Sequence, residues 1–167
     1  IDYGGNLHIS APSNDWAALR PYKAVIVCYG TNVLAKGKPV RMGGTGVYLA
    51  NTSKLNLNGY DQSIGRFYMG WTPANYPSNY TSVDSSTPAM LEIATDAAYN
   101  DVVQVRFTNA AGLRFDAPGS ITFTNQTSST KGTLEVARGT VRFAAPWKDA
   151  ALWDVHTPGN LYACTLS

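Results

Sequence analysis

The sequence predicts an all-β protein built as a single-stranded, right-handed parallel β-helix, a solenoid of stacked short strands. Three observations carry this prediction: short runs of alternating apolar and polar residues, recurring strand–corner–strand units, and a low content of charge. Charged residues make up 14% of the chain, against roughly 25% in a typical soluble domain. An antiparallel β-sandwich is the alternative, because short strands separated by turns at about 8–12-residue spacing also fit hairpins.

Each predicted strand places two apolar side chains on one face with a polar side chain between them, the period of a half-buried strand. Gly, Asn, Asp, Ser or Pro separates these runs, as is typical of tight turns. Helical periodicity is weak, and the best candidates, 15–19 and 149–153, would form one or two turns. The predicted strands are 47–49, 55–57, 103–107, 113–115, 121–123, 134–136 and 141–143.

The strands recur as pairs joined by a corner. Residues 113–115 lead through a corner that contains Gly119 to 121–123, and 134–136 lead through Gly139 to 141–143. One such unit is too small to bury its own apolar face, so successive units are expected to stack in parallel register and share one core.

The Asn58-Gly59 pair would supply the positive φ angles that a tight corner needs. Leu55, Leu57 and Ile64 are expected to point inward. Asn56 and Asn58 are expected to stack with equivalents in adjacent coils and to satisfy backbone groups at the bend.

Two regions depart from the repeat. Residues 1–43 lack a clear repeat and are predicted to be an N-terminal cap or atypical first coils, although 24–29 has the composition of a buried strand. Residues 44–167 are predicted to form the solenoid repeats. Within them, 69–89 is rich in Tyr, Pro, Ser, Asn and Thr and is predicted to be an inserted loop.

Charge and hydropathy exclude several classes of protein. The 13 basic and 11 acidic residues are spread thinly, with a net charge of +2, so no basic cluster is present that would bind nucleic acid. No segment reaches the ~20 apolar residues that span a bilayer.

The chain begins at Ile1, and we expect it to be a fragment of a longer protein. Cys28 and Cys164 are either a disulfide, which would suit an oxidising compartment, or two separate buried thiols.

Two segments resemble a known family. Residues 54–65, KLNLNGYDQSIG, are similar to a stretch that recurs in the passenger domains of bacterial autotransporters. Residues 132–143, GTLEVARGTVRF, resemble the passenger-associated transport repeat of the same family, and Trp147 with 152–161 fits its usual continuation. The resemblance covers 45–67 and 112–166. The break at 69–89 and the unmatched first segment depart from the family pattern.

The resemblance implies a pectin-lyase-like parallel β-helix that is exported across the outer membrane. Such a segment would be secreted or displayed on the extracellular side of the cell surface, where it would have a structural or adhesive role. Its partners would be a glycan or a ligand on a host or cell surface. An exposed strand edge at the end of a solenoid would also allow pairing with another copy of the chain.

The sequence contains no recognisable catalytic residues, cofactor site or metal site. His8 and His156 stand in no triad signature, and G-x-S-x-G is absent. A carbohydrate-active enzyme on the same fold is the alternative, and it would need two carboxyl groups across a groove. The closest carboxylates in the sequence are Glu92, Asp96 and Asp101.

A second alternative is a glycan-binding module that uses the aromatic part of the predicted loop. Aromatic rings would stack on sugar faces while amides bond to hydroxyl groups. The competing interpretation is that the same rings fold onto the solenoid and hold the loop in place. The residues of this predicted platform are Trp71, Tyr76, Tyr80, Asn75 and Asn79.

Overall fold

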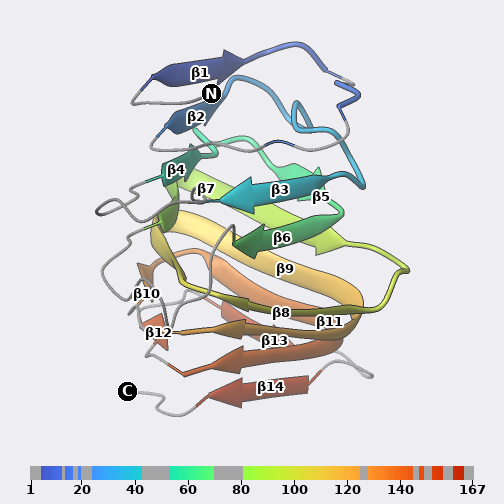
Figure 1. The fold of residues 1–167 in the computed structure, drawn as a ribbon. Coiled ribbons are helices and arrows are strands. Elements are labelled where there is room, and N and C mark those ends of the chain that lie inside the picture. Colours follow the sequence, from blue (N-terminus) through green and yellow to red (C-terminus); the bar gives the residue numbers. More distant parts are fainter. Residues whose placement is uncertain are drawn as a thin grey trace, which may run out of the picture.

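The computed structural model describes residues 5–12, 14–16, 19, 24–42, 53–69, 81–124, 128–144, 147–148, 152–155 and 160–163. In these residues the protein is all-β, and its strands stack as a solenoid of about five turns (Figure 1). Every strand pair between them is parallel. The predicted parallel solenoid is therefore confirmed, and the antiparallel sandwich is wrong because it requires antiparallel pairs.

The strands are short near both ends of the stack and long in the middle, where β7, β9 and β11 continue around corners. The described strands are β1 (Asn6–Ile9), β2 (Val25–Cys28), β3 (Pro39–Met42), β4 (Ser53–Asn56), β5 (Gln62–Ile64), β6 (Arg66–Met69), β7 (Thr81–Ala94), β8 (Tyr99–Val103), β9 (Val105–Phe123), β10 (Ser128–Thr130), β11 (Thr133–Phe143), β12 (Trp147–Lys148), β13 (Leu152–Val155) and β14 (Asn160–Ala163).

The strands form three ladders that run along the solenoid axis. The first ladder is β1-β2-β4-β7-β9-β10-β12. The second ladder joins β5, the end of β7, the middle of β9, the start of β11, and β13. The third ladder joins β8, the end of β9, the end of β11, and β14. Strands β3 and β6 form a separate two-stranded sheet, and β6 lies beside β8.

The core is a set of apolar columns, because parallel in-register pairing places equivalent residues directly above one another. Leu91, Leu113 and Leu134 form one column in the second ladder. In the third ladder the rings of Phe123 and Phe143 stack with centroids 5.3 Å apart. The residues predicted to point inward, Leu55, Leu57 and Ile64, are all fully buried.

Asparagine residues shape the corner that follows the first ladder. Asn32, Asn58 and Asn109 have φ angles of 52°, 53° and 59° there, a conformation that asparagine tolerates better than most residues. The Asn58 Nδ2 group donates to the Cys28 carbonyl oxygen at 3.1 Å, one turn away, and the Asn56 Oδ1 atom accepts from the Asn58 N–H at 2.9 Å. The predicted tight corner is confirmed.

The N-terminal region continues the same stack, since β1 pairs with β2 and β2 with β4. The predicted strand at 24–29 is confirmed as β2. The loop predicted over residues 69–89 is shorter at its C-terminal side, because β7 begins at Thr81. Thr81 and Ser85 are fully buried, so this part of the predicted loop packs into the solenoid as a strand. Residues 70–80 lie outside the described residues.

Candidate functional site

The predicted aromatic platform falls on residues that the structure does not describe. Trp71, Asn75, Tyr76, Asn79 and Tyr80 all lie within 70–80. A glycan site built from these side chains therefore stays a prediction.

The histidines form no described catalytic arrangement. The His8 ring stacks on the Tyr29 ring, with centroids 5.2 Å apart and an interplanar angle of 19°, and His156 lies outside the described residues. No helix in the described parts of the chain has the length and apolar character that crossing a bilayer requires.

Cys28 is a free thiol in the core, and burial raises its pKa to about 12. Cys164 lies outside the described residues, so the predicted disulfide is not directly tested. The two alternatives, a disulfide with Cys28 or two separate thiols, therefore both stay predictions.

The three carboxylates that lie closest in the sequence, Glu92, Asp96 and Asp101, are not gathered at one site in the structure. Asp101 binds Arg66, with Nε–Oδ2 and Nη2–Oδ1 distances of 2.7 and 2.9 Å. Glu92 and Asp96 instead bind Arg114 and Arg138.

Parallel register creates a carboxylate cluster that the sequence analysis did not anticipate. Glu92, Arg114 and Glu135 are successive partners on the outer face of the second ladder. Arg114 lies 3.5 Å from Glu92, 3.3 Å from Glu135 and 3.9 Å from Asp116. The sequence did contain a signal for this cluster, because Arg114 and Glu135 occupy equivalent positions in consecutive strand repeats.

Arg138 extends this charged network around the corner. Its guanidinium donates to Asp116 at 2.9 Å, to Asp96 at 3.1 Å and to the Thr95 carbonyl oxygen at 2.9 Å. The hydrogen bonds to Asp96 and Asp116 raise the pKa of Arg138. Four carboxylates here share two arginines, and no group of three or more His, Cys, Asp or Glu side chains among the described residues is arranged to hold a metal ion.

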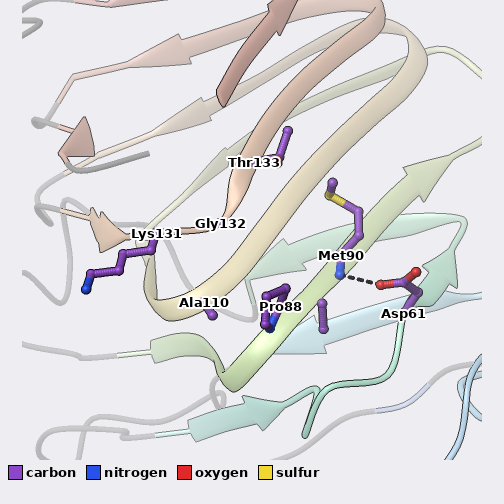
Figure 2. Close-up of a pocket in the computed structure, with 8 residues that line it drawn as sticks. Asp61, Pro88, Met90, Ala110, Lys131, Gly132 and Thr133 are labelled. Carbon is purple, nitrogen blue, oxygen red and sulfur yellow. Dashed lines mark hydrogen bonds between the residues drawn. The ribbon is translucent and has the colours of Figure 1, made fainter. Parts of the chain in front are cut away.

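A surface groove of about 400 Å³ opens at the corner between the first and second ladders (Figure 2). Three successive strand pairs separate its ends, since it extends from the corner after β4 to the corner before β11. The Asp61 Oδ1 atom accepts from the Met90 N–H at 2.7 Å. The residues that define the groove are Asp61, Pro88, Met90, Ala110, Lys131 and Thr133.

Unequal corner lengths in consecutive turns produce this groove. Ser85 and Ala89 of β7 pair with Asn109 and Ala111 of β9, so three residues of β7 lie opposite the single residue Ala110. In the next turn Thr130 pairs with Asn109 and Leu134 with Leu113, so that corner has the same number of residues as the corner of β9. The hollow therefore lies beside the longer corner of β7.

Comparisons with protein-family models, with curated proteins and with solved structures found no match for this chain. The solenoid and its surface therefore carry the functional argument.

Proposed function

We propose that the chain is a segment of a secreted or surface-displayed β-solenoid, similar to an autotransporter passenger, with a structural and adhesive role. The observation that carries this proposal is the continuous parallel stack, whose apolar columns fill the interior and leave ladders of polar side chains outside. Such a stack gives an extended, repetitive surface of the kind that solenoids use for binding.

The charged network around Arg114 and Arg138 supports a non-catalytic role. A glycosidase needs one carboxyl group that can act as an acid and a second that acts as nucleophile or base. Glu92, Asp116 and Glu135 each have a guanidinium within 4 Å. These charge pairs join three successive turns, which is the expected arrangement for a structural network.

The test is binding of the labelled chain to an array of glycans and extracellular surface proteins, with Trp71→Ala and Trp71→Phe measured in parallel. We expect saturable binding to at least one surface molecule. Loss of binding in Trp71→Ala with retention in Trp71→Phe would assign recognition to the aromatic segment. Equal binding by all three chains would assign it to the described faces, and no binding to any component would contradict the adhesive role.

A further inference from the structure

We propose that the corner groove binds an extended peptide that carries a basic side chain at one end and an acidic side chain four residues away. This inference rests on the proposed function, because it names a partner for an adhesive surface. It is carried by the charges and the length of the groove.

The two ends of the groove have opposite charge. In Figure 2, Asp61 and Lys131 lie at opposite ends of the labelled residues, and the Lys131 side chain extends outward. Both residues are exposed, and neither forms an ion pair among the described residues. A ligand with complementary charges would meet a carboxylate at one end and an ammonium group at the other.

The surface between these charges is small and largely apolar. Pro88, Ala89, Met90 and Ala110 contribute to it. Gly132 packs directly against the preceding turn beside Lys131, because a Cβ atom there would collide with the Ala111 carbonyl group. This surface would contact an apolar side chain of a bound peptide.

The length of the groove matches an extended backbone. Three strand spacings of about 4.8 Å give about 14 Å between the ends, and an extended chain covers that distance in about four residues at roughly 3.3 Å per residue. Side chains at positions i, i+2 and i+4 of an extended peptide share one face. A peptide of the pattern Lys-x-Ala-x-Glu would therefore direct all three side chains into the groove.

This charge pattern favours a peptide over a glycan. An acidic sugar would supply a partner for Lys131 and none for the exposed Asp61 carboxylate. A peptide supplies both charges and the apolar side chain between them.

The experiment measures fluorescence anisotropy with three end-blocked, labelled pentapeptides: Lys-Gly-Ala-Gly-Glu, Lys-Gly-Ala-Gly-Lys and Glu-Gly-Ala-Gly-Glu. We expect the full chain to bind the Lys/Glu peptide roughly two- to fivefold more tightly than the other two, as exposed charge pairs allow. Lys131→Glu should transfer the preference to the Lys/Lys peptide. Asp61→Asn keeps an acceptor for the Met90 N–H and should remove the discrimination at that end.

Lys36→Glu is the matched control, because Lys36 is exposed outside the groove and its replacement changes the net charge by the same amount. It should leave the order of the three peptides unchanged, and circular dichroism should show that each variant retains the fold. Equal affinity for all three peptides, absence of saturable binding, or binding of a neutral or acidic oligosaccharide that Lys131→Glu abolishes would overturn the proposal. Surface binding on the array without peptide binding would refute this inference alone, and peptide binding without surface binding would refute the proposed function alone.

Discussion

At the scale of single residues, Asp84 illustrates how the outer face of the first ladder is stabilised. Its carboxylate accepts hydrogen bonds from Asn109 Nδ2 at 2.6 Å and Thr108 Oγ1 at 2.9 Å, and it lies 3.2 Å from Lys54 Nζ. Burial acts to raise the pKa of Asp84, but the hydrogen bonds from Asn109, Thr108 and Lys54 outweigh it, and the pKa is lowered. Asp84 thus connects strands from three consecutive turns.

This lowered pKa predicts a specific dependence of stability on pH. A carboxyl group whose pKa is depressed in the folded state stabilises the protein above its unfolded pKa of about 3.9 and loses that contribution as the pH falls through the folded pKa. Asp84→Asn should therefore cost about 1 kcal/mol of unfolding free energy at pH 7, and this cost should shrink as the pH falls below about 3.9 and through the folded pKa. Urea denaturation of both chains across this range measures the difference, and a constant difference would contradict the assignment.

At the scale of elements, corners determine whether successive strands stay in register. Gly139 has a φ angle of 82° in the corner of β11, and a Cβ atom there would collide with the Ala117 carbonyl oxygen of the preceding turn. Gly37 has a φ angle of 70°, but a Cβ atom there would meet no atom within 4 Å.

The two glycines predict substitutions of unequal cost. Gly139→Ala should destabilise the protein by about 2–4 kcal/mol, because both the positive φ angle and the close backbone approach oppose a side chain. Gly37→Ala should cost about 1 kcal/mol from the φ angle alone. Denaturation midpoints measure both values, and equal losses would show that the turns are not as closely stacked at Gly139 as described.

At the junction between β6 and β8, side-chain contacts join the two strands in place of backbone pairing. Arg66 binds Asp101 and lies over the rings of Tyr68 and Tyr99 at 5.0 and 5.8 Å. The Tyr99 hydroxyl, buried at this junction, donates to the Phe67 carbonyl oxygen, and burial raises the pKa of Tyr99. This contact between side chain and backbone joins β6 to β8 where no strand pairing between them is described.

Removal of the Arg66 contacts should destabilise β3 and β6 locally, more than the rest of the solenoid. We expect Arg66→Ala to cost about 1 kcal/mol and to raise amide exchange rates in β3 and β6 roughly fivefold. Exchange in β9 and β11 should change little, because their pairing does not involve Arg66. Hydrogen exchange followed by mass spectrometry distinguishes this local effect from a uniform increase, which would contradict it.

At the scale of the whole molecule, the stacking of coils was predictable because the period-2 runs and Gly-containing corners repeat along the chain. Two features were not. Residues 103–107 have the alternation of one continuous strand, yet buried Gln104 separates β8 from β9 at a corner. The groove depends on the extra residues in the corner of β7, and the period-2 pattern of the strands does not reveal that length.

The central claim is that consecutive coils pair in parallel and in register, and engineered disulfides test it most directly. Asn100 pairs with Ser120, and Ser120 with Thr140, on the outer face of the third ladder; the Ser120 hydroxyl donates to Asn100 Oδ1 at 3.0 Å. Neighbouring strands lie about 4.8 Å apart, within the Cα separation that a disulfide accepts, whereas two spacings of about 9.6 Å exceed its limit of about 7 Å.

The measurement is disulfide formation under mild oxidation, in a Cys164→Ser background that leaves Cys28 buried. Asn100→Cys with Ser120→Cys should crosslink within the monomer and retain the thermal midpoint of the reduced protein. Asn100→Cys with Thr140→Cys should stay reduced. Crosslinking of the second pair in preference to the first would contradict the stacked register on which the structural and functional account depends.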